Sequence, residues 1–162
     1  MDIKELLDQF TLFDPAKGQR AELPAVEGNY IVVLKAGCNI PDVLGNFKYT
    51  EISLHGVDYR VLYTGIASDL KRRIWTNHLH GNGGNSTLRK TLGSLFGYQK
   101  IPRDKNYQIN KKTKFGAEDE KSLTAWMEHN LLFAYLANDK SKELESFLIN
   151  SLLPPLTVEG SK

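Results

Sequence analysis

Cysteine and long hydrophobic runs are scarce in this sequence, and each shortage excludes a class of protein. Cysteine occurs once, as Cys38, so the chain cannot be a fold held together by internal disulfide bonds. The longest apolar runs, such as residues 30–34, are much shorter than the roughly 20 residues that cross a membrane as a helix. The first residues lack the basic and then apolar pattern of a secretory signal. We therefore expect a cytoplasmic protein that is not inserted in a membrane.

The overall composition is that of an ordinary globular protein. Of 162 residues, 41% are hydrophobic and 25% are charged, which excludes wholesale disorder. A chain of this length buries roughly 70% of the surface that its unfolded form exposes. We therefore expect residues 1–162 to form one domain around one core.

Acidic residues are almost missing from the middle of the chain. Residues 70–115 contain eleven lysines and arginines and one acid, Asp104. This stretch carries a net charge of +10, and because the whole chain carries +2, the other residues together carry −8. Nucleic acid gains affinity from such a concentration of positive charge, because each neutralised phosphate releases counterions. The alternative interpretation is a basic surface that is merely solvated.

The hydrophobic pattern predicts a small α/β domain with about three strands. Runs of β-branched and aromatic residues predict strands at 30–34, 59–63 and 131–136, with a weaker one at 47–55. Apolar residues at helical spacing predict an N-terminal helix within residues 1–12 and further helices at 70–77, 86–95, 122–130 and 141–152. Residues 97–116 are polar and basic without clear periodicity, so they form either a surface loop or a segment that a ligand orders.

Two tyrosine tripeptides, an arginine and a glutamate follow one another in an order that carries more information than any one of them. Gly28-Asn29-Tyr30 opens the first predicted strand, Tyr63-Thr64-Gly65 closes a later one, and Arg73 lies in the helix that follows. Glu145 lies in the last helix, ahead of a double proline. By this order and spacing, the chain resembles the GIY-YIG nuclease superfamily. The two tyrosines are further apart than in most members, which predicts an inserted hairpin or loop at 37–58.

Over residues 27–157 the resemblance implies a small, mainly antiparallel three-stranded sheet flanked by helices, and a metal-dependent endonuclease acting on double-stranded DNA. Glu145 would hold Mg²⁺ or Mn²⁺, because hard cations take oxygen ligands and keep several waters. Arg73 would bind the phosphate through its planar fork of donors. Tyr30 and Tyr63 would activate the water, which requires nearby positive charge because a free phenol has a pKa of about 10. Which of the two takes the proton stays open.

Several positions depart from the family's pattern. Asn29 and Thr64 replace the central isoleucine of the two tripeptides, a change that we expect to affect the strand interior more than the chemistry. Thr157 stands where the family often has asparagine after the double proline. Many members have a histidine four residues after the arginine, where this chain has Asn77 followed by His78. Because one residue turns a side chain by about 100° on an α-helix, it stays open which of these two serves in the site.

Basic residues near these positions are candidates for contact with the nucleic-acid backbone, and they are Lys71, Arg72, Arg89, Lys90, Lys111 and Lys112. The glycine-rich loop 81–86 ends where a helix begins, so it either binds phosphate or simply connects two helices. His78 and His80 have the spacing of a zinc half-site, but no neighbouring cysteine or third ligand accompanies them, and we expect no zinc.

Two other functions stay open. The main alternative is a nucleic-acid-binding module of the same fold without cutting activity, although all four chemical positions are filled. The second is a protein-interaction domain whose basic segment meets an acidic partner. Because one active site cuts one strand, cleavage of both strands would require a homodimer or two binding events.

Overall fold

The computed structural model describes residues 2–38 and 47–157. Within them, five strands form one antiparallel sheet with the order β1-β7-β2-β4-β3. The strands are β1 (Thr11–Phe13), β2 (Gly28–Leu34), β3 (Glu51–Leu54), β4 (Val57–Ala67) and β7 (Leu131–Ala137). The helices are α1 (Ile3–Leu7), the 3-10 helix η1 (Arg20–Glu22), the π-helix η2 (Arg72–Leu79), α3 (Thr87–Leu95), α4 (Tyr107–Asn110), α5 (Ala117–Asn130) and α6 (Ser141–Leu152).

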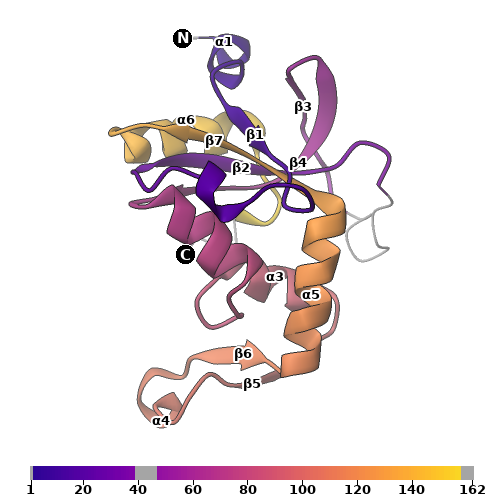
Figure 1. The fold of residues 1–162 in the computed structure, drawn as a ribbon, viewed down its shortest axis with the longest axis vertical. Coiled ribbons are helices and arrows are strands. Elements are labelled where there is room, and N and C mark those ends of the chain that lie inside the picture. The colour runs from indigo at the N-terminus through magenta and orange to yellow at the C-terminus, as the bar shows by residue number, and fades with distance from the viewer. Residues whose placement is uncertain (1, 39–46, 158–162) are drawn as a thin grey trace.

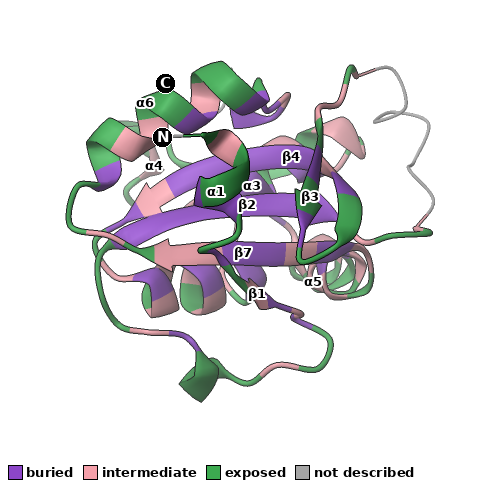
Figure 2. Cartoon of the chain, turned by 90° about the horizontal axis from the view of Figure 1, so that it is seen from above, coloured by how far each residue is buried: buried purple, intermediate pink, exposed green. Residues whose placement is uncertain are grey.

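Helices cover both faces of this sheet, as Figures 1 and 2 show. Every residue of β2 is buried, because this central strand has a neighbour on each side and helices on each face. Its alternate side chains enter two cores: Tyr30 and Val32 pack with η2, α3 and α5, whereas Ile31 and Val33 pack with α1 and α6. The sheet therefore separates two different environments.

The sheet is wider than the three strands predicted from sequence, although the α+β class is confirmed. The N-terminal helix ends at Leu7 instead of continuing to residue 12, and the chain then forms β1, which pairs with β7. A strand of three residues has no hydrophobic period of its own, so only the open edge of β7 defines it.

At the other edge of the sheet, β3 pairs with the first residues of β4 through a tight turn. His55 and Gly56 form this turn, and both have positive φ angles. The hairpin falls within the predicted insertion at 37–58, of which residues 39–46 lie outside the described part of the chain.

The later helices follow local signals in the sequence. α3 begins after Ser86, whose hydroxyl accepts the N–H of Arg89 at 3.1 Å, and α6 has the predicted bounds. α5 begins at Ala117, well before the predicted start at Ser122. It has no side-chain cap, but its first turn carries three acids that stabilise a helix N-terminus through the helix dipole.

Residues 100–115 project from the body of the molecule as an arm (Figure 1). β5 (Lys100–Pro102) pairs with β6 (Thr113–Phe115) as a separate antiparallel sheet, and α4 lies between them. The arm is anchored at its base by Phe115, which is buried against Gly83 and Gly93. In the part of the chain that the structure describes, no helix is long and apolar enough to cross a membrane.

Candidate active site

The register of β2 against β4 places Tyr30 and Tyr63 on the same face of the sheet. Tyr30 lies opposite Gly65, and Tyr63 lies opposite Val32. The two rings are stacked with their centroids 6.1 Å apart. A Cβ atom on Gly65 would overlap the phenol of Tyr30, so the glycine of the second tripeptide is needed for this ring to lie across β4. The two tripeptides therefore build one structure.

The helix η2 brings a histidine to the tyrosines because its turn is wider than that of an α-helix. The N–H of His80 bonds to the carbonyl of Trp75 at 3.0 Å, the i→i−5 pattern of a π-helix. His78 therefore lies one hydrogen-bonded turn after Arg73, and it is fully buried. Asn77, at the position of the family's histidine, is only partly buried. The π-helix absorbs the extra residue, so that His78 rather than Asn77 enters the site.

Hydrogen bonds link Tyr30 to the start of α3. The Tyr30 hydroxyl and His78 Nε2 are 2.6 Å apart, and His78 Nδ1 and the Ser86 hydroxyl are also 2.6 Å apart. The ring of Tyr63 lies edge-on against His78, with the centroids 5.9 Å apart. Sequence analysis identified Ser86 only as a helix cap, because nothing local indicates that a capping hydroxyl also contacts a buried histidine.

Burial and charge control the protonation of these groups. Burial lowers the pKa of His78 to about 3, and the charges of Arg73 and Arg89 act in the same direction, so the imidazole is neutral near pH 7. Burial raises the pKa of Tyr30 well above its ordinary value, and the neighbouring Tyr63 adds to this rise. Burial also raises the pKa of Tyr63, and the interaction with Tyr30 opposes this rise without cancelling it.

The charges of Arg73 and Glu145 both act on the two phenols. The charge of Arg73 lowers the pKa of each tyrosine and the charge of Glu145 raises it, so both charged groups are within electrostatic reach of the rings. Arg73 comes from η2 on one face of the sheet, and Glu145 comes from α6 on the other. A hollow of about 380 Å³ at the end of β4 is lined by Arg73 and by the start of α6. The four side chains on which the sequence prediction rested therefore interact through their charges, and their roles in catalysis stay predictions.

The substituted position in the first tripeptide holds α6 in place. Asn29 is fully buried, and its side-chain amide donates to the carbonyl of Ser141 at 2.8 Å. Its amide oxygen accepts a hydrogen bond from Asn138 at 3.1 Å. Isoleucine could make neither bond. Asn29 therefore fixes the start of the helix that carries Glu145, an effect on the site that the sequence analysis did not anticipate.

Thr157 fixes the segment that follows α6. Its buried hydroxyl accepts the N–H of Thr64 at 2.7 Å and donates to the carbonyl of Thr64 at 3.0 Å. The N–H of Leu156 bonds to the carbonyl of Leu62 at 3.0 Å. This segment therefore runs along the edge of β4, and Thr157 serves the backbone of that strand in the place where the family often has asparagine.

The surroundings of Glu145 suit a divalent metal ion. Burial raises the pKa of its carboxyl, and the carboxylate makes no hydrogen bond or ion pair with any residue that the structure describes. A bound cation would offset this cost of burial. Mg²⁺ is held by as few as one or two carboxylates, with water and phosphate oxygens completing its shell. Among residues 2–38 and 47–157 there is no cluster of three or more His, Cys, Asp or Glu side chains, so Glu145 would be the anchoring ligand.

His78 and His80 do not form a zinc half-site. Both ring nitrogens of His78 are engaged in hydrogen bonds inside the protein. His80 is exposed, and its ring lies against Trp75 with the centroids 4.5 Å apart.

Arg89 does not reach the surface, contrary to the prediction that it contacts nucleic acid. Its side chain is fully buried and forms an ion pair with Glu120 at 2.9 Å. Its guanidinium also donates to the carbonyls of His78 and Leu79, each at 3.0 Å. Arg89 therefore holds the end of η2, and with it His78. In the sequence an arginine beside Lys90 looks like part of a basic surface, because its acidic partner is 31 residues away.

Glu120 extends this buried network to the glycine-rich loop and the arm. While its Oε1 pairs with Arg89, its Oε2 accepts the N–H of Gly83 at 2.8 Å and the N–H of Phe115 at 2.9 Å. Glu120 was not among the residues predicted from the sequence. An acid in the first turn of a helix is usually explained by the helix dipole alone, so nothing local indicates its buried partners.

The other predicted nucleic-acid contacts lie at or near the surface. Lys71 and Arg72 are at the start of η2, beside Arg73. Lys111 is on the arm, with its ammonium group 5.2 Å from the centroid of the Tyr107 ring. Lys90 of α3 and Lys112 of the arm line a polar cavity of about 250 Å³, which Arg73 also lines.

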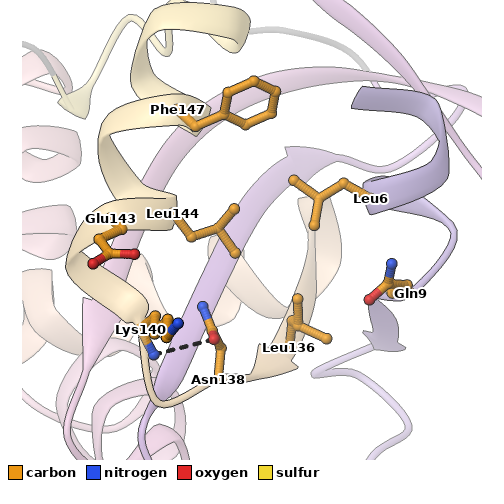
Figure 3. A pocket seen from close by; sticks show the side chains of 8 residues that line it. All are labelled: Leu6, Gln9, Leu136, Asn138, Lys140, Glu143, Leu144 and Phe147. Carbon is orange, nitrogen blue, oxygen red and sulfur yellow. Dashed lines mark hydrogen bonds between the residues drawn. The ribbon is translucent and has the colours of Figure 1, made fainter. Parts of the chain in front are cut away.

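A groove of different character lies on the other face of the sheet, between α1 and α6 (Figure 3). It has a volume of about 330 Å³ and is lined by four apolar side chains, Leu6, Leu136, Leu144 and Phe147, and by four polar or charged residues at its edge, Gln9, Asn138, Lys140 and Glu143. Leu144, the neighbour of Glu145 in α6, lines the groove, whereas Glu145 does not.

Comparison with known proteins gives one match. The family model described as the GIY-YIG catalytic domain matches residues 28–162, which include both tyrosine tripeptides and the glutamate. No curated protein and no solved structure matches the chain. Because the match covers most of the sequence, the resemblance inferred from the spacing of tyrosines, arginine and glutamate is confirmed: the chain belongs to the GIY-YIG catalytic domain family.

Proposed function

We propose that the protein is an endonuclease that hydrolyses phosphodiester bonds in double-stranded DNA with the help of a divalent metal ion, Mg²⁺ or Mn²⁺. The observation that supports this most is the electrostatic coupling of four side chains from β2, β4, η2 and α6, namely Tyr30, Tyr63, Arg73 and Glu145. Hydrolysis requires a deprotonated water and neutralisation of the charge on the phosphate, and this set contains a group for each task.

Arg73 is the group that binds the scissile phosphate. Within the described residues its guanidinium has no acidic partner in an ion pair, so its planar fork is available for two phosphate oxygens. Its charge also favours the ionised form of the tyrosines. Arg73 therefore both binds the phosphate and helps to ionise the tyrosine that acts as the general base.

Tyr63 is the phenol that takes the proton from water. The interaction with Tyr30 and the charge of Arg73 both lower the pKa of Tyr63 against the rise that burial causes, whereas Tyr63 adds to the rise in the pKa of Tyr30. With His78 neutral, the Ser86 hydroxyl can donate to Nδ1, and Nε2–H can donate to the Tyr30 hydroxyl. The rings of Tyr30 and His78 both lie against the ring of Tyr63 and position it.

Glu145 is the residue that would hold the metal ion. A divalent ion bound there would act as a Lewis acid that neutralises charge on the phosphate and lowers the pKa of water. Glu145 serves in its ionised form, and Asn29 keeps it in position through the start of α6.

Cleavage of supercoiled plasmid tests this function, with Mg²⁺ or Mn²⁺ and with EDTA. We expect metal-dependent conversion to nicked circles by the unmodified protein. Tyr63→Phe, Arg73→Ala and Glu145→Gln should each lower the rate by about 10²–10⁴. Persistence of full activity in these variants would contradict the assigned roles.

The chain supplies matched controls for two of these variants. Arg20→Ala removes the same charge from an exposed arginine of η1, and Glu143→Gln changes an exposed carboxyl one turn or less from Glu145 in α6. Both should cleave within about threefold of the unmodified protein, because neither side chain is part of the site. Salt-dependent DNA binding with no cleavage under any metal condition would instead identify an inactive binding module.

A further inference from the structure

A polar cavity adjoins the candidate active site on the side of α3 and the arm. It has a volume of about 250 Å³ and is lined by cationic side chains from three elements: Arg73 of η2, Lys90 of α3 and Lys112 of the arm. Ser86, Thr87 and Thr113 add hydroxyl groups to its wall. We call this the basic cavity. Arg73 belongs both to it and to the site beside the tyrosines.

The positive charge of the basic cavity is not compensated by the protein. None of the three cations forms an ion pair with an acid in the described part of the chain. Glu120 lies in the wall behind the cavity, but its two oxygens are already used by Arg89 and by the N–H groups of Gly83 and Phe115. A cavity that collects cations and leaves them unpaired is suited to an anion.

The walls of the basic cavity are held in a fixed arrangement. Glu120 ties the glycine-rich loop to the base of the arm, and Arg103 of the arm donates to the carbonyl of Gly84 at 3.3 Å. The arm and α3 are therefore connected on the far side of the cavity from Arg73. An anion entering the cavity meets an arrangement of donors that is already formed, which reduces the cost of binding.

We propose that the basic cavity holds a second, uncleaved phosphate of the DNA strand, next to the one that Arg73 presents for hydrolysis. This proposal rests on the proposed nuclease function, and it predicts the path of the DNA strand over the protein surface. From the tyrosines the strand passes Arg73, enters the cavity and continues along the arm, where further lysines are exposed. The cavity is large enough for a phosphate with part of its sugars, since one liquid water takes about 30 Å³. It reads no base sequence, because its donors meet only the backbone.

Binding of a short fluorescent DNA duplex in EDTA, measured at several salt concentrations, tests the cavity without any cleavage. For Lys90→Ala/Lys112→Ala we expect the slope of log affinity against log salt to fall by about two, because two phosphate contacts are lost. Both side chains are exposed, so the melting temperature should not change. The matched control, Lys4→Ala/Lys140→Ala, removes two exposed lysines from the α1–α6 side and should keep the full slope.

Competition by short oligonucleotides separates a site from a general attraction. Thymidine trinucleotide TpTpT has one more internucleotide phosphate than the dinucleotide TpT, so the unmodified protein should bind TpTpT better. The double lysine variant should bind the two equally. Equal preference for TpTpT in both proteins, or an unchanged salt slope, would overturn the second phosphate site.

The two proposals fail in different ways. If the lysine variant binds DNA like the unmodified protein while Glu145→Gln and Arg73→Ala abolish plasmid cleavage, the cavity proposal is wrong and the nuclease function stands. If the unmodified protein neither binds nor cleaves DNA, the nuclease function itself is wrong.

Discussion

The basic cavity and the apolar groove between α1 and α6 have similar volumes, about 250 and 330 Å³, but opposite chemistry. The cavity is lined by unpaired cations and hydroxyl groups, whereas three leucines and a phenylalanine make up half of the residues that line the groove (Figure 3). One face of the sheet therefore concentrates groups that can engage a polyanion. The other face carries the packing that supports α6 and, through it, Glu145. The cations that can bind phosphate therefore gather on one face of the sheet, and the helix that carries Glu145 packs on the other.

The largest effect on stability should come from breaking the buried pair behind the basic cavity. Arg89→Met would leave Glu120 and two backbone carbonyls without their donor, and we expect a loss of about 3–5 kcal/mol in the free energy of unfolding. Chemical denaturation measures it. Lys90→Met, the exposed neighbour, should change stability by about 0.5 kcal/mol or less. Equal effects of the two variants would show that the network does not hold the cavity wall.

A smaller effect should appear when the pH is lowered. The folded pKa of His78, about 3, lies below its unfolded value, so the unfolded chain binds more protons between the two values. His78 therefore contributes stability above pH 6.5 that is lost as the pH falls, at about 1.4 kcal/mol per pH unit. Chemical denaturation at several pH values between about 4 and 7 measures the slope of the free energy of unfolding against pH. His78→Gln should remove it, and an unchanged slope in this variant would mean that His78 is not the group that titrates.

The smallest effect on stability should come from a substitution at the edge of the groove between α1 and α6. Phe147 is 39% exposed, so Phe147→Ser gives up only the buried part of the ring, and we expect a loss of about 1 kcal/mol or less in the free energy of unfolding. Cleavage by this variant should equal that of the unmodified protein, because Phe147 does not contact the tyrosines. A large loss of activity with little loss of stability would show that the two faces are not independent.

Local sequence signals were enough for several elements and for the family. The bounds of α6 and the serine cap of α3 follow from residues within a few positions of each other, and so does the buried strand around Tyr30. The extra strands and the arm could not be predicted, because three-residue strands are defined by their partners rather than by their own pattern. The catalytic roles of Tyr63, Arg73 and Glu145 stay predictions, which the electrostatic effect of Arg73 and Glu145 on the phenols supports.

The contribution of the sequence alone was the identity of the chemical groups: two tyrosines, an arginine and a glutamate in an order typical of one family. Only the tertiary structure decided that His78 rather than Asn77 faces Tyr30, that Arg89 is buried against Glu120, and that Asn29 anchors α6. The reason is physical. Hydrophobic periodicity and capping are properties of neighbouring residues. Burial, ion pairing and the pKa of a side chain depend on residues that are distant in the chain and close in space.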